Sequence, residues 1–264
     1  MGKKNGSHLR MFILLPFLAV FIISGCKVAG ILYDSAVQRQ KFNSLSDEFY
    51  GAGAQEGTQP DKMYTDAVEE SEMMPKFKAL YEQNSDLGGW IRIEGTDIDY
   101  PVMFTPEEPQ KYLRMAFDGT YSIYGVPFFG AGCNLDPLSD DLFVYGHNMN
   151  DGSIFAALLK YKDKRFWEEH RIVELDTLYK TYRYEIFAAL TTDLASAETE
   201  HFYDYTDNID EKNYTDLVSD IEAAALYETG VKAIYGDKLL TISTCSYHAE
   251  DGRLLVVAKL LPQE

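Results

Sequence analysis

Alternation of apolar and polar residues dominates the chain from Gly88 onward. In TYRYEI, residues 181–186, every second side chain is apolar or aromatic, the period of an antiparallel strand with one buried face. Short β-branched and aromatic runs of this kind recur between Gly, Pro, Asn and Asp. The clearest are residues 142–146, 171–175, 178–190, 238–244 and 253–261. The pattern predicts a mainly β domain, arranged as a closed or nearly closed barrel.

Several segments instead have the spacing of amphipathic helices. Residues 34–50 and 75–84 precede the β domain, with a turn-rich linker at 51–61 between them. A short helical segment at 151–161 and a longer one at 210–228 interrupt the strand series. The apolar face of the longer one comprises Tyr214, Leu217, Val218 and Ile221. We expect the first two helices to form an appendage outside the core and the longest insertion to pack on the barrel wall.

The N-terminus has the pattern of a membrane segment. Residues 11–25 carry no charge and follow a basic stretch at 1–10. That run is shorter than the roughly 20 residues needed to span a bilayer, but 11–33 is long enough if Lys27 extends to the interface. Basic residues on the leading side favour a cytoplasmic N-terminus. A signal anchor with the bulk of the chain outside the cell membrane is therefore predicted.

Two other interpretations of this segment stay open. IISGC resembles a lipobox, in which Cys26 is lipidated after cleavage, and a cleaved signal peptide would release the domain altogether. All three interpretations place the rest of the chain outside the cytoplasm. The predicted organisation is a cytoplasmic tail at 1–10, a single-pass membrane anchor at 11–33, a helical appendage and linker at 34–87, and a β domain at 88–264.

Net charge and cysteine spacing argue against several kinds of partner and site. The 264 residues include 42 acidic and 24 basic side chains, and the formal net charge is −18 at pH 7. Such a charge repels phosphates, so nucleic acid is not an expected partner. Cys26, Cys133 and Cys245 lie far apart and form no CxxC pair. Neither a disulfide framework nor a zinc site is expected, and no metal or cofactor is predicted.

Cys245 ends the apolar strand in TISTC and precedes a polar turn, with Ser243 on the same strand face. A thiol near its ordinary pKa of about 8.5 is only a few per cent thiolate at neutral pH, so a nucleophilic cysteine needs a neighbouring base or cation. Free cysteines are otherwise often buried structural residues. Position alone fits both a structural and a nucleophilic role.

Two of the five histidines are candidates for the base. His147 follows an apolar strand through Gly146, where Asn148 can orient its ring; a structural turn role fits equally well. His248 lies 3 residues after Cys245, in a turn where nothing fixes its ring. The remaining ones precede the membrane segment or lie in acidic, solvated turns: His8, His170 and His201.

Arg253 opens the last strand, across a turn from Cys245. An arginine at such a place can simply keep a sheet edge soluble. Its guanidinium is also a permanently charged set of donors that can hold a carbonyl or stabilise an oxyanion. Together with Cys245 and His147 it would suit acyl transfer.

These motifs resemble those of the sortases, the membrane-anchored cysteine transpeptidases of Gram-positive bacteria. YGHNM around His147, TISTC ending at Cys245 and RLLVVAKL opening at Arg253 occur in the family's order. GWIRIEGTDIDYPVM, FDGTYSIYGVPFF, the N-terminal helices and the helix inserted before the cysteine strand are similar to class B. The resemblance runs from about residue 34 to the C-terminus.

The resemblance implies an eight-stranded β-barrel and catalysis through a thioester. Cys245 would attack the carbonyl after the threonine of a C-terminal sorting signal. His147 would protonate the leaving amine and then deprotonate the incoming one, and Arg253 would position the signal and support the oxyanion. Ser243 and Asn148 are the expected substrate-binding residues.

The implied partners are secreted proteins that bear a sorting signal and an amine of a peptidoglycan stem or cross-bridge. Class B members commonly take an Asn-Pro-x-Thr signal and often serve haem or iron uptake. Two alternatives stay open. A pilin-polymerising sortase accepts a lysine side chain of another pilin, and an inactive barrel would act only as a wall-binding module.

Overall fold

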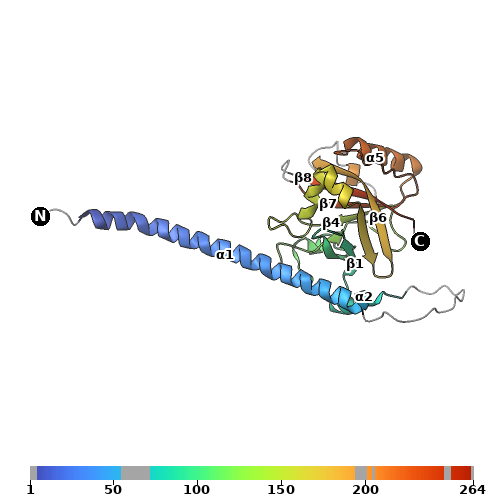
Figure 1. Ribbon diagram of the computed structural model, residues 1–264. Coiled ribbons are helices and arrows are strands. Elements are labelled where there is room, and N and C mark those ends of the chain that lie inside the picture. The colour runs from blue at the N-terminus through green and yellow to red at the C-terminus, as the bar shows by residue number, and fades with distance from the viewer. Residues whose placement is uncertain (1–4, 55–71, 194–200, 204–205, 247–250, 263–264) are drawn as a thin grey trace. The chain divides into compact units, whose positions relative to one another are not determined.

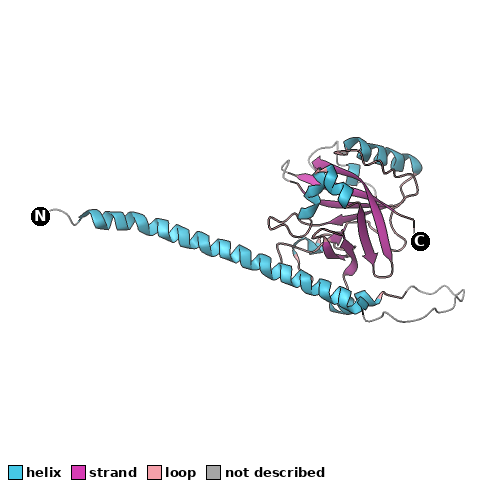
Figure 2. Cartoon of the chain, in the orientation of Figure 1, coloured by secondary structure: helices cyan, strands magenta, loops and turns pink. Residues whose placement is uncertain are grey.

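The computed structural model describes residues 5–54, 72–193, 201–203, 206–246 and 251–262 (Figure 1). The chain divides into two units, Met1–Ser44 and Leu45–Glu264. The described part of the first consists of helix, and the second contains a β-barrel with short helices around it (Figure 2).

Helix α1, Asn5–Ala54, is continuous through the two N-terminal segments that the sequence predicts separately. Within Phe17–Ala52 it has a stretch long and apolar enough to cross a membrane, and none of that stretch is buried in protein. Phe21, for example, is 76% exposed. An apolar helix without protein contacts is stable in lipid, so α1 is a candidate membrane anchor. A signal sequence near the N-terminus can meet the same criteria of length and composition.

The last turns of α1 belong to the barrel unit. Phe49 stacks on Trp90 with ring centroids 4.2 Å apart, and Phe77 of helix α2 (Pro75–Gln83) meets Phe49 edge-on. All three side chains are almost completely buried. The compact unit therefore starts within α1, earlier than the expected boundary at Gly88, because these aromatic side chains pack on the first strand.

Eight strands close into the barrel in the spatial order β1-β2-β3-β4-β7-β8-β6-β5. They are β1 (Leu87–Arg92), β2 (Asp99–Met103), β3 (Phe128–Phe129), β4 (Asp141–Tyr145), β5 (Ile172–Thr177), β6 (Thr181–Asp193), β7 (Leu239–Cys245) and β8 (Gly252–Leu260). The pairs β2–β3 and β4–β7 are parallel, and the others are antiparallel. The predicted mainly β, eight-stranded barrel is confirmed.

Burial follows the predicted alternation where the sheet has a solvated face. In β6, Tyr184 and Ile186 are fully buried, whereas Thr181 and Arg183 are exposed. In β7, by contrast, residues 239–244 are buried on both faces. A helix at residues 211–224 packs on Leu239 and so buries part of the outer face as well.

Helix α5, Glu211–Ala224, covers part of the wall as expected. Its predicted apolar face packs with residues of β6, β7 and β8: Phe187, Leu190, Leu239, Leu255 and Val257. Asp210 caps the helix, since its side chain accepts a hydrogen bond from the Asn213 amide at 2.8 Å. The segment expected to be helical at 151–161 instead forms the 3-10 helix η2 (Ala156–Lys162), followed by α3 (Lys164–Glu169).

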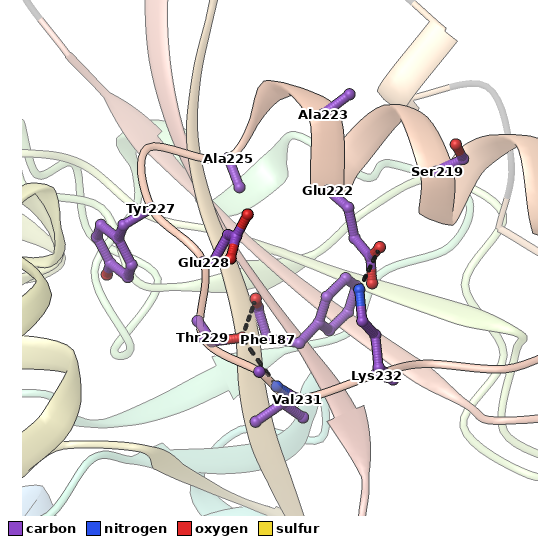
Figure 3. Close-up of a pocket in the computed structure, with 11 residues that line it drawn as sticks. Phe187, Ser219, Glu222, Ala223, Ala225, Tyr227, Glu228, Thr229, Val231 and Lys232 are labelled. Atoms are coloured by element: carbon purple, nitrogen blue, oxygen red, sulfur yellow. Dashed lines mark hydrogen bonds and ion pairs between the residues drawn. The ribbon is translucent and has the colours of Figure 1, made fainter.

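A cavity of about 360 Å³ lies between the end of α5 and the loop that follows it (Figure 3). Glu222 and Lys232 on its wall form an ion pair at 2.8 Å. The Thr229 hydroxyl donates to the Phe187 carbonyl at 2.8 Å. These contacts hold the loop after α5 against β6, and through it the chain that leads into β7.

Candidate active site

A cleft of about 490 Å³ opens where β4 and β7 end. These strands are parallel neighbours with Tyr145 opposite Ser243. Beyond that pair, the Thr244 hydroxyl donates to the Gly146 carbonyl at 2.8 Å. His147 and Cys245 therefore leave the sheet on adjacent strands in the same direction, and both line the cleft.

Gly146 is required by close packing at this point. A Cβ atom there would lie 2.4 Å from the ring of Phe155, closer than non-bonded carbon atoms approach. The glycine lets β4 pass the buried Phe155 ring and deliver His147 to the cleft. This is the physical reason for the strand-glycine-histidine pattern.

Cys245 and Arg253 are directly paired across the β7–β8 ladder, and both line the cleft. Side chains opposite each other in antiparallel strands have Cβ atoms about 5 Å apart. Cys245 is partly exposed, unlike Cys133, which is 5% exposed and accepts a hydrogen bond from the Phe143 amide. Burial raises the pKa of Cys133 to about 11. Of the two, Cys245 has the environment of a reactive thiol.

The His147 ring is held by a main-chain carbonyl that the sequence did not indicate. Its Nε2 lies 2.8 Å from the carbonyl oxygen of Leu113 in the 3-10 helix η1 (Lys111–Arg114). A carbonyl only accepts hydrogen bonds, so Nε2 carries the hydrogen. Nδ1 is then the ring nitrogen that can accept and release a proton.

Burial lowers the pKa of His147. The bond to Leu113 opposes this shift, whereas the positive charges of Arg114 and Arg253 add to it. The imidazole is therefore mainly neutral at pH 7, and the imidazolium is a minor form.

We expect the His147 imidazole to titrate below its ordinary pKa of about 6.5. Arg114→Gln removes a like charge and should raise the pKa of His147 at low salt. The unfolded chain takes up this proton at higher pH than the folded chain, so His147 lowers the free energy of unfolding as pH falls below 6.5. NMR titration of the imidazole Hε1 resonance measures the midpoint.

The matched control is Arg165→Gln, which removes the same charge from an exposed pair with Asp163. It should leave the His147 midpoint unchanged. Added salt should reduce the effect of Arg114→Gln. A wild-type midpoint at or above 6.5 would contradict the assignment.

Of the two expected substrate-binding residues, Ser243 lies on the cleft wall and Asn148 does not. Ser243 lines the cleft and is 1% exposed, and its hydroxyl lies beside Tyr203, where it opposes the rise that burial causes in the Tyr203 pKa. The Asn148 amide donates to the Cys245 carbonyl at 3.1 Å. Asn148 thus secures the backbone that carries the thiol, a contact different from the ring orientation expected from sequence.

The other histidines do not add to this cleft in the part of the chain that is described. His170 places Nδ1 2.9 Å from the Glu94 carbonyl, in a different hollow of the surface. His248 lies outside the described residues, as do the side chains of His8 and His201. No three His, Cys, Asp or Glu side chains among the described residues cluster as metal ligands.

Known proteins with similar sequences and structures are sortases. A family model described as "Sortase domain" matches residues 91–261. Sortase B of Staphylococcus aureus is 26% identical over 246 residues, which cover 92% of this chain and 93% of that protein. Sortase B of Listeria monocytogenes is 28% identical over 260 residues, covering 98% and 99%. A structure described as a Staphylococcus aureus sortase B-substrate complex has the same fold, with a TM-score of 0.74, 24% identity and coverage of 88% and 100%.

Proposed function

Because the chain belongs to the sortase family, within class B, we propose that the Cys245 cleft is the acyl-transfer site of a cell-wall sorting transpeptidase. One observation carries this assignment. The barrel register pairs Cys245 with Arg253 and sends His147 from the neighbouring parallel strand into the same cleft. Residues from two distant parts of the chain thus share one binding space.

In the first step, the Cys245 thiol gives its proton to Nδ1 of His147, and the sulfur attacks the carbonyl carbon at the scissile bond of a sorting signal. The C–N bond breaks, and the leaving amine takes that proton from Nδ1. In the second step, an incoming amine attacks the thioester and returns its proton to the same nitrogen as the thiolate leaves. The guanidinium of Arg253 stabilises the oxyanion in both steps.

Ser243 is the proposed contact for the signal peptide. A serine hydroxyl can donate one hydrogen bond and accept two, so a peptide group in the cleft can bind Ser243 beside Tyr203. The proposed substrates are secreted proteins with an Asn-Pro-x-Thr-like signal and a peptidoglycan amine. Asn148 contributes by a hydrogen bond to the Cys245 carbonyl, which fixes the backbone that carries the nucleophile.

The proposed location is the cell membrane, with residues 1–10 in the cytoplasm and the barrel outside. The basic leading residues and the bare apolar surface of α1 support this orientation. Mass spectrometry of the mature N-terminus distinguishes it from its alternatives. Diacylglycerol on Cys26 would replace the signal anchor by a lipid anchor.

The test is turnover of fluorogenic sorting peptides by residues 34–264, with and without added amines. We expect cleavage of an Asn-Pro-x-Thr peptide in preference to a scrambled one, and an amine-dependent ligation product. Triglycine and a diaminopimelate stem peptide probe the wall amine. Ligation only to a pilin lysine would support the pilin alternative, and no cleavage of any peptide would support the inactive barrel.

A further inference from the structure

The carbonyl that holds His147 comes from a weak structural element. Helix η1 has only 4 residues, and a single 3-10 turn is not stable by itself. Leu113 is also 38% exposed, so its own side chain does not anchor the turn in the core. The direction of its carbonyl must therefore be set by neighbouring groups.

A partly buried polar network supplies one side of this support. Asp86 Oδ2 accepts hydrogen bonds from Lys111 Nζ at 2.6 Å and from the Tyr112 hydroxyl at 2.9 Å. Asn84 Nδ2 donates to the Tyr112 hydroxyl and to the Phe117 carbonyl, each at 2.7 Å. The network thus ties η1 to the residues between α2 and β1.

The other side is a close backbone contact. Gly125 has φ +61°, and a Cβ atom there would lie 2.5 Å from the Tyr112 carbonyl oxygen and 2.8 Å from that of Leu113. The Val126 amide donates to the Tyr112 carbonyl at 3.1 Å. The peptide groups of Tyr112 and Leu113 are therefore confined between the network and the segment at Gly125.

We propose that Asp86, Asn84 and Tyr112 are positioning residues for the His147 imidazole, acting through the Leu113 carbonyl. The inference rests on the acyl-transfer role proposed for His147. A catalytic ring must keep one tautomer and one orientation through both proton transfers. The network stabilises this tautomer and orientation because it fixes the Leu113 carbonyl, which accepts the Nε2 hydrogen.

The charge state of Asp86 suits this role. Burial alone would raise the pKa of Asp86, but hydrogen bonds from Lys111 and Tyr112 hold it below its ordinary value. Asp86 is therefore ionised at neutral pH, and its hydrogen bonds are charge-assisted and strong. The network therefore keeps these hydrogen bonds to η1 at neutral pH.

Tyr112→Phe is the most direct test, because it removes hydrogen bonds from the network without changing any charge. We expect kcat to fall roughly tenfold, since small misplacement of a catalytic group is costly. KM for the sorting peptide should change less than about twofold. The pKa of His147 should fall further, because its bond to Leu113 raises that pKa. Asp86→Asn should likewise lower kcat and the pKa of His147.

Asp140→Asn is the matched control. Asp140 pairs with Lys238 at 2.8 Å, with side-chain exposures of 26% and 35%, against 28% and 32% for Asp86 and Lys111. Both substitutions should lower the thermal midpoint by similar amounts. Only Asp86→Asn should change kcat and the His147 titration.

Lys111→Met separates geometry from electrostatics. Loss of a positive charge by itself would raise the pKa of His147, whereas loosening of η1 lowers it. A fall in this pKa supports the proposal, and a rise contradicts it. Unchanged kcat and unchanged titration in Tyr112→Phe and Asp86→Asn would overturn it. The NMR readout needs no substrate, so it decides on positioning even if no sorting peptide is cleaved.

Discussion

Replacing Cys245 by alanine should abolish the thioester and reduce transpeptidation by roughly 10⁴-fold or more. The covalent route requires a nucleophile at this position, and the described cleft offers no second thiol. Mass spectrometry of the acid-quenched enzyme should show the acyl adduct for the wild type and none for Cys245→Ala. Amine-dependent product should disappear with it.

Cys133→Ala is the control for loss of a thiol. Cys133 is buried in the barrel unit, where its sulfur accepts a hydrogen bond from the Phe143 amide. This variant should lose some stability and keep the acyl adduct. Full activity of Cys245→Ala would refute the transpeptidase assignment and leave the inactive barrel as the better description.

The placement of Cys245 and Arg253 on either side of one turn could be predicted from sequence because it depends on local alternation. Apolar periodicity in β7 and β8 puts Cys245 at the end of one strand and Arg253 at the start of the next, and the structure pairs them directly. The strand that ends before His147 is recognised in the same way. Each of these residues is placed by the period of its own strand, so no distant contact had to be known.

The partners of the site residues could not be predicted in this way. Leu113 binds His147 through a main-chain carbonyl, and every residue has such a carbonyl, so no residue type signals it. Asn148 illustrates the same problem, since its neighbour in sequence is His147 but its amide bonds to Cys245. These contacts depend on how loops meet in space.

The start of the compact unit was missed for a related reason. The amphipathic pattern of 34–50 indicates that one helix face is covered, but it does not identify the cover. Phe49 is buried by Trp90 and Phe77, which lie in separate later elements. A helical pattern therefore predicts the existence of a contact, and only the fold tells whether it belongs to an appendage or to the core.

Arg253→Met should lower kcat roughly 10²- to 10³-fold, the usual effect of losing a donor to an oxyanion. The loss should occur although the pKa of His147 rises, because Arg253 is one of the charges that lower it. More imidazolium at neutral pH would favour protonation of the leaving amine. If the rate falls although more His147 is protonated, the loss comes from the missing contact of Arg253 with the oxyanion and not from its charge effect on His147.

Two further variants complete the argument. Arg114→Gln also removes a like charge near His147 but is not part of the Cys245–Arg253 pair. It should reproduce the rise in the pKa of His147 without the large loss in kcat. Arg253→Lys keeps the charge and loses the planar set of donors, so it should restore only part of the rate. If Arg253→Met and Arg114→Gln gave equal rates, Arg253 would act through charge alone and not as the oxyanion donor.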